Sequence, residues 1–242
     1  KTLPITIEGT TMPLAQNHIE NLGSAQVKSA LLTAFLNTPG RSTIEEKKIS
    51  RNHTEILLKK ISADIKVKKL KKGNLISLVG QKNLNSFNYK VDSDPSSAAF
   101  LIALALLTPN AKLTINNCLC NESRIGFYKL LKYKGKANIK IKNLRRSPNS
   151  GELVGSIVAK NSSIKPINCS KQLAPSLIDE LPILFVIAAL TNGISKFQGI
   201  NEITKKESNR MEEMRKILIQ IGVRCKTTKD KMIIYGKNKI NV

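Results

Sequence analysis

Residues 24–36 read Ser-Ala-Gln-Val-Lys-Ser-Ala-Leu-Leu-Thr-Ala-Phe-Leu, an apolar run with the length of a helix, and they open the unit that decides the fold. Pro39-Gly40 predicts a turn after this run, and residues 41–45 then alternate as a short strand. An amphipathic helix around 56–61 and a strand over 64–67 follow. The predicted order of elements is therefore helix, strand, helix, strand.

The same order returns twice further along the chain. The second copy is expected at 96–107, 112–115, 127–131 and 137–141, and the third at 181–190, 194–198, 211–218 and 223–227. More strands are expected at 75–79, 153–158 and 232–235, and at the start of the chain over 3–7. Such a unit is too long for a solenoid repeat, so the sequence predicts an α/β protein that uses one small subdomain several times.

Each copy carries an arginine in the polar turn before its second helix, at Arg51, Arg124 and Arg210. The first N–H groups of a helix are unpaired and its dipole is positive there, so an arginine beside that end makes an anion site. The alternative is that each arginine only covers its helix end or pairs with a surface carboxylate.

The charge points to anionic partners. The 242 residues include 32 Lys, 8 Arg and 17 Asp+Glu, for a formal net charge of +23. Nucleic acid, an anionic membrane or phosphorylated metabolites would all fit this charge. Arginine is scarce and aromatic residues are only 4% of the chain, which argues against nucleic acid. Most of the lysines are therefore expected on a solvated surface.

The cysteines and the apolar runs exclude further classes. The cysteines at 118, 120, 169 and 225 form no CxxC pair and lie far in sequence from both histidines, so no zinc site is expected. They are expected to be free, inert thiols in a reducing compartment. The apolar runs 98–107 and 181–190 are too short for a membrane span.

Three blocks place polar side chains at helix starts. Ser24 suits an N-cap, and Gln26 and Lys28 are expected to project near the same helix end. Asp179 precedes a very apolar helix, where it either caps the helix or acts in proton transfer. Residues 206–210, Lys-Glu-Ser-Asn-Arg, either clamp anionic oxygens while the glutamate handles a proton, or form a charged capping turn.

Six blocks stand in a distinctive order: Ser-Ala-Gln-Val-Lys-Ser-Ala (24–30), Ser-Arg-Asn-His-Thr-Glu (50–55), Asp-Pro-Ser-Ser-Ala-Ala-Phe (94–100), Asn-Glu-Ser-Arg-Ile-Gly-Phe (121–127), Ile-Asp-Glu-Leu-Pro-Ile (178–183) and Lys-Glu-Ser-Asn-Arg (206–210). Together they resemble the 5-enolpyruvylshikimate-3-phosphate (EPSP) synthases, also called 3-phosphoshikimate 1-carboxyvinyltransferases. The resemblance implies repeated βαβαββ units in two domains that close on substrate, incomplete in this chain. Residues 1–91 would be the latter part of the first domain and 92–242 most of the second.

The resemblance also implies an activity: transfer of the enolpyruvyl group of phosphoenolpyruvate to the 5-hydroxyl of shikimate 3-phosphate, with release of phosphate. It assigns shikimate 3-phosphate to Ser24, Ala25, Gln26, Ser50, Arg51, Asp179 and Lys206, phosphoenolpyruvate to Gln26 and Arg210, and catalysis to Asp179, Glu207 and Lys206. It implies no metal or cofactor, a cytoplasmic monomer, and no nucleic-acid or membrane partner. These two anionic substrates also fit the positive charge.

Some features of the family are missing. Its early Gly-Ser-Lys-Ser block, its Asn-Ala-Gly-Thr loop and its late Asp-His-Arg block are absent, and Thr204 and Asn209 stand where Arg and Asp are common. We therefore expect a central fragment of a longer enzyme that is inactive alone. Two alternatives remain: a UDP-N-acetylglucosamine enolpyruvyl transferase of the same fold, and a basic nucleic-acid-binding module of α/β repeats.

Overall fold

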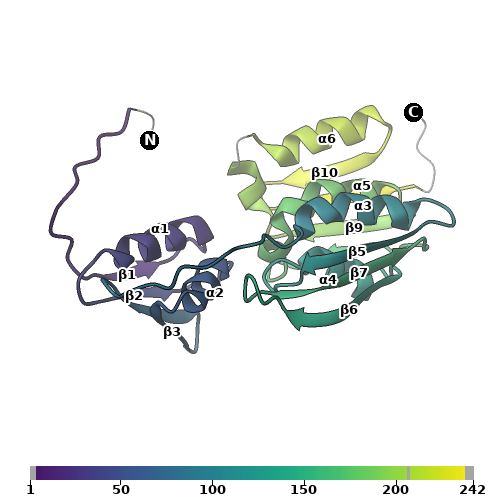
Figure 1. The fold of residues 1–242 in the computed structure, drawn as a ribbon. Coiled ribbons are helices and arrows are strands. Elements are labelled where there is room, and N and C mark those ends of the chain that lie inside the picture. Colours follow the sequence, from purple (N-terminus) through teal and green to yellow (C-terminus); the bar gives the residue numbers. More distant parts are fainter. Residues whose placement is uncertain (1–3, 206–207, 238–242) are drawn as a thin grey trace. The chain divides into compact units, whose positions relative to one another are not determined.

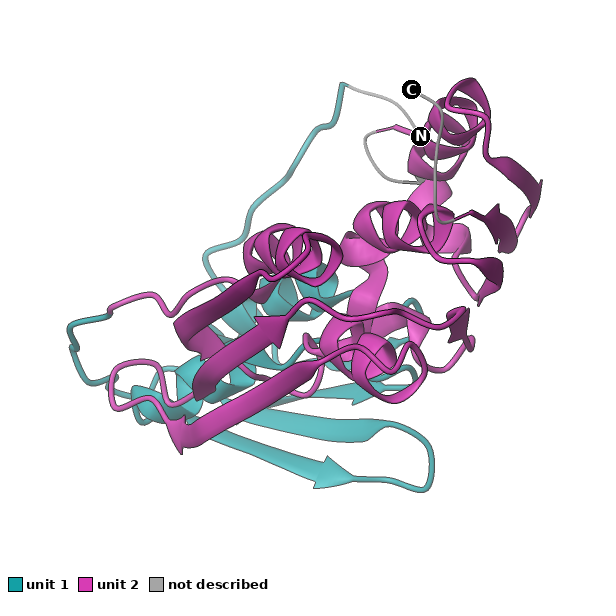
Figure 2. Cartoon of the chain, turned by 90° about the vertical axis from the view of Figure 1, so that its right-hand side faces the viewer, with its two compact units in different colours: residues 1–89 teal, residues 90–242 magenta. Residues whose placement is uncertain are grey.

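The computed structural model describes residues 4–205 and 208–237. The chain divides into two compact units, Lys1–Tyr89 and Lys90–Val242 (Figure 2). The predicted boundary between domains, after residue 91, lies two residues further along the chain than this division after Tyr89. Residues 83–92, which lead from one unit into the next, contain no helix or strand.

The first unit is one βαβαββ repeat (Figure 1). Its elements are β1 (Asn17–Glu20), α1 (Ala25–Leu36), β2 (Arg41–Glu46), α2 (His53–Lys60), β3 (Asp64–Lys69) and β4 (Asn74–Val79). The sheet has the order β1-β2-β4-β3, with β1 and β2 parallel and the other pairs antiparallel.

Both helices of this unit contribute to one small core. On β2 every second residue is buried, and Ile44 pairs with Ile76 of β4. Leu32 of α1 and Leu58 of α2 pack on this face, which explains why the helices need their apolar stripes.

The second unit contains two further copies. The first consists of α3 (Pro95–Leu107), β5 (Lys112–Leu119), α4 (Gly126–Tyr133), β6 (Ile139–Arg146) and β7 (Leu153–Lys160). The second consists of β8 (Asn168–Cys169), η1 (Ala174–Glu180), α5 (Leu181–Ala189), β9 (Gly193–Gln198), η2 (Asn201–Lys205), α6 (Arg210–Gln220), β10 (Arg224–Thr228) and β11 (Lys231–Gly236).

The three copies share one topology. The order β8-β9-β11-β10, with β8 and β9 parallel, reproduces β1-β2-β4-β3. The middle copy has the order β5-β7-β6, and a parallel bridge between Ser93 and Cys118 stands where a first strand would lie. The predicted α/β fold built from repeated units is confirmed.

The apolar helices α3 and α5 occupy the core of the second unit. Helix α3 packs on β5 and β7, α5 packs on β11, and the two helices contact each other. Ile102 on α3 and Phe185 on α5 are fully buried. This burial explains why both helices are apolar around almost their whole circumference.

Sequence patterns missed two strands and predicted one that is not there. Strands β1 and β8 are short edge strands, and their pairing with β2 and β9 is not visible in local alternation. The strand expected over 3–7 is wrong for Pro4–Ile7, which form no helix or strand and lie exposed, and residue 3 lies outside the described residues. Alternation alone does not supply a partner strand.

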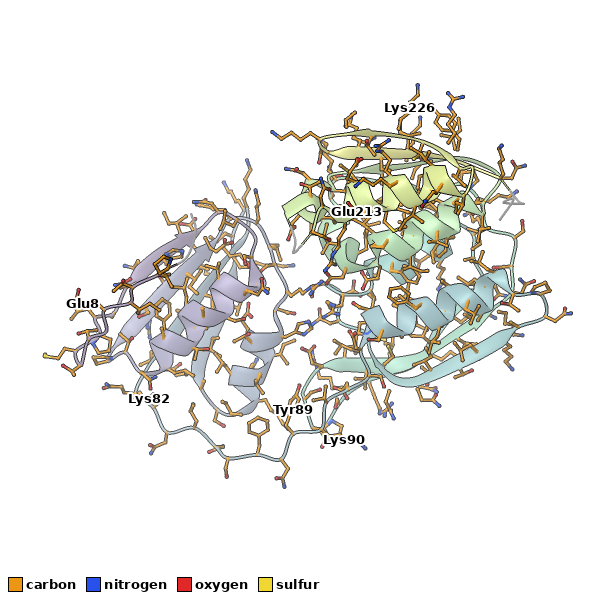
Figure 3. All side chains as sticks on the ribbon, turned by 90° about the horizontal axis from the view of Figure 1, so that it is seen from above. Glu8, Lys82, Tyr89, Lys90, Glu213 and Lys226 are labelled. Carbon is orange, nitrogen blue, oxygen red and sulfur yellow. The ribbon has the colours of Figure 1, made fainter. Side chains whose placement is uncertain are left out.

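The strand that follows the second helix of each copy, β3, β6 or β10, is an edge strand that carries exposed basic residues. They are Lys66, Lys68 and Lys69 on β3, Lys140, Lys142, Arg145 and Arg146 on β6, and Arg224 and Lys226 on β10. Figure 3 shows Lys226 projecting outward from β10.

Over the described residues, no helix is long and apolar enough to cross a membrane.

Candidate active site

The Ser24 block forms the start of α1. Ser24 is the N-cap residue, and its Oγ accepts a hydrogen bond from the Val27 N–H at 3.3 Å, which confirms the predicted cap. Ala25 is half-buried and Gln26 is exposed. The block therefore presents a helix N-terminus with a long amide side chain beside it, and α1 has no acidic residue in its first turn.

The Ser50 block leads into α2. Ser50 and Arg51 are both half-buried. The N–H and the Oγ of Ser50 donate hydrogen bonds to Oε1 of Glu46, at 2.8 and 2.7 Å. Asn52 is the N-cap residue of α2 without a side-chain capping bond. Glu46, which ends β2, thus fixes the segment that presents Arg51.

The structure brings these two blocks together within the first unit. Oγ of Ser29 lies 2.6 Å from Oγ1 of Thr54, which joins the N-terminal halves of α1 and α2. The Lys28 ammonium lies 2.9 Å from Glu46 and 2.7 Å from Glu55. The expectation that Lys28 projects near the helix end is therefore wrong, because these carboxylates hold it in the interior at 1% exposure.

Asp179 lies in the second unit on η1, half-buried, next to the buried Glu180. Helix α5 begins at Leu181, and its N-cap position is held by Glu180 and not by Asp179. Ser96, at the start of α3, hydrogen-bonds Glu180 and ties η1 to that helix. Asp179 is thus held on a short helical segment beside a buried carboxylate.

The last predicted block is only partly described. Lys206 and Glu207 lie outside the described residues. Arg210 is the first residue of α6 and is half-buried, and the Asn209 side chain caps this helix by accepting from the Glu212 N–H at 3.2 Å. Segment η2, directly before the block, contacts η1, the segment that contains Asp179. Asn209 therefore serves as a cap where the family commonly has Asp.

Arg124 pairs with a carboxylate at the start of α3. Its guanidinium lies 2.8 Å from Oδ1 of Asp94 and donates to Oγ of Ser96 at 2.7 Å, with only 15% of the side chain exposed. The alternative reading, pairing with a carboxylate, is correct for this arginine. Arg124 fixes the start of α3 in the second unit.

The cysteines do not offer a nucleophile. All four are free thiols, as predicted. Burial raises the pKa of Cys118 to about 12 and that of Cys120 and Cys169 to about 11. A thiol with so high a pKa is almost entirely protonated at neutral pH. Among the described residues, no group of three or more His, Cys, Asp or Glu side chains could hold a metal ion.

A polar cavity of about 380 Å³ lies elsewhere in the second unit, where bulges interrupt β5 and β6. None of the predicted site residues lines it. Four of its polar side chains bind one another: Arg145 donates to Asn117 at 2.6 Å, and Ser147 donates to Asp92 at 3.2 Å. We therefore place the candidate site at the helix starts and not in this cavity.

Sequence reasoning missed the two buried acids that hold the loops of the first unit, Glu20 and Glu46. Their signal in the sequence is weak, because glutamates are mostly exposed in folded proteins and these two look like surface residues. In the first unit the result is two adjacent helix starts, a guanidinium and small polar groups. That combination suits a phosphate or carboxylate ligand.

The fold defines the class of protein. The solved enolpyruvyl transferase NikO from Streptomyces tendae superposes with a TM-score of 0.63 at 13% identity, covering 94% of this chain and 52% of that one. At this identity the likeness concerns the fold alone. The three βαβαββ-type copies thus form an enolpyruvyl transferase fold.

The chain belongs to the EPSP synthase (3-phosphoshikimate 1-carboxyvinyltransferase) family, whose model matches residues 1–242. A solved EPSP synthase from Acinetobacter baumannii superposes with a TM-score of 0.84 at 34% identity over 96% of this chain and 51% of that one. Curated 3-phosphoshikimate 1-carboxyvinyltransferases from Bartonella quintana and Caldicellulosiruptor saccharolyticus are 39% and 38% identical over 98% and 97% of the chain. The chain spans about half the length of these relatives, 53% of each.

Proposed function

We propose that this chain forms part of an enzyme that transfers the enolpyruvyl group of phosphoenolpyruvate to the 5-hydroxyl of shikimate 3-phosphate and releases phosphate. The observation that carries the proposal is the match of the EPSP synthase family to the whole chain. The meeting of the Ser24 and Ser50 blocks in one unit supports it. The relatives' names favour this activity over transfer to UDP-N-acetylglucosamine.

The first unit would bind shikimate 3-phosphate. Ser24, Ala25 and Gln26 offer a helix N-terminus to its phosphate, and the Ser50–Arg51 block adds a guanidinium. Gln26 would also reach phosphoenolpyruvate, whose other clamp would be Arg210 at the start of α6. Positive helix ends and cations would offset the repulsion between two anionic substrates.

The second unit would supply the proton chemistry. Asp179 would orient the 5-hydroxyl and take its proton as the oxygen attacks phosphoenolpyruvate, and Glu207 would protonate the methylene carbon. Lys206 would bridge the substrates, and phosphate would leave from the tetrahedral intermediate. Two separated carboxylates can hold opposite proton roles because their environments differ. In this proposal the reaction uses no metal or cofactor.

We further propose that residues 1–91 and 92–242 are parts of the two domains of the enzyme, which would act as a cytoplasmic monomer without nucleic-acid or membrane partners. The overall positive charge would then serve the attraction of small anions. The 242-residue chain by itself is expected to lack turnover, because it spans about half the length of its relatives.

The test is an NMR titration of the 242-residue chain with shikimate 3-phosphate at physiological salt. We expect saturable shifts of the Ala25, Gln26 and Arg51 amides, and much weaker shifts with shikimate, which lacks the phosphate. UDP-N-acetylglucosamine tests the alternative acceptor. Shifts produced by an oligonucleotide that vanish steeply with salt, and none by shikimate 3-phosphate, would favour the nucleic-acid-binding alternative.

A further inference from the structure

Two buried acids lie side by side at the ends of parallel strands in the first unit. Glu20 ends β1 and Glu46 ends β2, and the two residues are partners in the pairing of these strands. Their exposures are 2% and 1%. A buried carboxylate is costly unless it is fully hydrogen-bonded or paired, so the bonds that each one makes are informative.

Each of these carboxylates binds the loop that follows its own strand. Glu20 accepts hydrogen bonds from the N–H groups of Leu22 and Gly23, at 2.7 and 2.8 Å, directly before Ser24. Gly23 has a φ of +76°, which favours glycine, so this turn has a defined shape. Glu46 accepts from both donors of Ser50, directly before Arg51. Both loops of the proposed phosphate site are thus fastened to one pair of acids.

The bonds of Ser50 limit what this residue can do. A serine offers one hydroxyl proton and one backbone N–H. Ser50 gives both to Oε1 of Glu46, so neither can also point fully at a phosphate while these bonds hold.

We propose that Glu20 and Glu46 are positioning residues that fix the Ser24 and Ser50 loops for anion binding, and that Ser50 serves as the anchor of the second loop through Glu46. The inference rests on the proposed function for the identity of the anion. It assigns to Ser50 a role through Glu46 in place of a direct contact with substrate.

Lys28 makes this arrangement compatible with an anionic ligand. Its ammonium bonds Glu46 and Glu55, which otherwise would add negative charge below the phosphate site. Burial alone would raise the pKa of Glu46, but hydrogen bonds from Ser50, Lys28 and Asn74 together hold it below its ordinary value. Glu46 is therefore ionised at neutral pH and is a strong acceptor for the loop.

The experiment is carried out on the 242-residue chain, with amide hydrogen exchange and shikimate 3-phosphate binding both followed by NMR. The variants are Glu46→Gln, Ser50→Ala, the double variant and Glu20→Gln. The matched control is Glu45→Gln, on the same strand but paired with Lys47 and only half-buried. Urea midpoints separate local loosening from global loss of stability, and Glu20→Gln gives an independent reading should Glu46→Gln not fold.

We expect Glu46→Gln to speed exchange of the Ser50 amide about tenfold, and Glu20→Gln to do the same for Leu22 and Gly23, since hydrogen bonds to charged groups are the strong ones. Glu46→Gln should weaken shikimate 3-phosphate binding about tenfold. Ser50→Ala should cause almost no further loss of shikimate 3-phosphate affinity in the Glu46→Gln background, because both changes weaken the same interaction between Ser50 and Glu46. Glu45→Gln should leave all these readouts within about twofold.

Two results would overturn the inference. One is an equal loss of affinity from Ser50→Ala in both backgrounds, which is the behaviour of a direct ligand. The other is unchanged exchange at Ser50, Leu22 and Gly23 in folded variants. Failure of the unaltered chain to bind shikimate 3-phosphate would count against the proposed function instead, and the exchange rates would still decide whether the two acids hold the loops.

Discussion

Arg124 and Asp94 form an ion pair at 2.8 Å that links the turn before α4 to the N-terminus of α3. Asp94 also accepts hydrogen bonds from the N–H groups of Ser96 and Ser97, so one carboxylate both caps a helix and binds a guanidinium. Burial would raise the pKa of Asp94, but these bonds and the charge of Arg124 keep it below its ordinary value. Arg124 therefore has a structural role in the second unit.

Replacing Arg124 should therefore destabilise the second unit without touching the proposed substrate contacts. We expect Arg124→Ala to lower the free energy of unfolding by about 1–3 kcal/mol, because a hydrogen-bonded, mostly buried charge is lost. Urea unfolding measures this change. Lys129→Ala, which removes an exposed pair with Glu122, is the control and should cost less than about 1 kcal/mol. Equal effects of the two changes would contradict the structural role.

Lys28→Met should be much more damaging than the loss of a surface lysine. It leaves Glu46 and Glu55 buried without their shared cation, and breaking a buried ion pair costs about 3–5 kcal/mol. Lys47→Met, at an exposed position, should change the free energy of unfolding by about 0.5 kcal/mol or less. Chemical denaturation of both variants checks the difference, and similar midpoints would show that the buried pairs contribute little.

Glu46→Gln should alter the dependence of stability on acid. The pKa of Glu46 in the folded chain lies below its ordinary value of 4.5, so the ionised group stabilises the fold above about pH 4.5. That contribution is lost as pH falls through the lowered folded pKa. The stability gap between the original chain and the variant should thus be widest near neutral pH and shrink below about pH 4.5. Urea titrations from pH 7 to 3 measure it, and a constant gap would be inconsistent with this linkage.

Gly126→Ala should disturb the contact that holds η1. A Cβ at Gly126 would lie 2.1 Å from the Ser176 side-chain oxygen and 2.8 Å from its carbonyl oxygen, so α4 and η1 would have to separate. We expect a loss of about 1–3 kcal/mol in the free energy of unfolding, as for other overpacked sites. Gly9→Ala is the control, since nothing lies within 4 Å of a Cβ there. A thermal unfolding midpoint unchanged by Gly126→Ala would refute this tight contact.

Asp179→Asn separates proton chemistry from a structural role. The variant is made in a full-length relative whose corresponding half is replaced by this chain. If Asp179 handles the proton of the 5-hydroxyl, kcat should fall about 10²–10⁴-fold while substrate affinity changes little. Phosphate release at saturating substrates measures it. A kcat within about threefold of the unaltered chimera would remove Asp179 from the proton chemistry.

The sequence predicted the repeated elements well because each has its own local signal. Helix α3, for example, follows from one apolar run between Asp94 and Pro109, and β2 follows from alternation. Strand β1 was missed because Asn-His-Ile-Glu becomes a strand only through its parallel partner β2. Pairing between distant segments leaves little trace in a short window of sequence.

The candidate site also combines features that local sequence predicts with features that depend on distant residues. Ser24 is recognisable as a cap from its own block, and the structure confirms that cap. The interior position of Lys28 could not be inferred, because its carboxylate partners come from residues 46 and 55, on two other elements. Local sequence gives the residue types at a helix start, whereas burial depends on charges that arrive from elsewhere.

The basic edge strands β3, β6 and β10 have a consequence for how molecules meet in solution. An open strand edge is a template on which a strand of another chain can add. Here the exposed edges carry rows of ammonium and guanidinium groups, such as Lys66 and Lys68 on β3 and Lys140 and Lys142 on β6. Two such edges repel each other before backbone hydrogen bonds can form. These basic residues therefore disfavour the addition of one molecule's edge strand to that of another in concentrated solution.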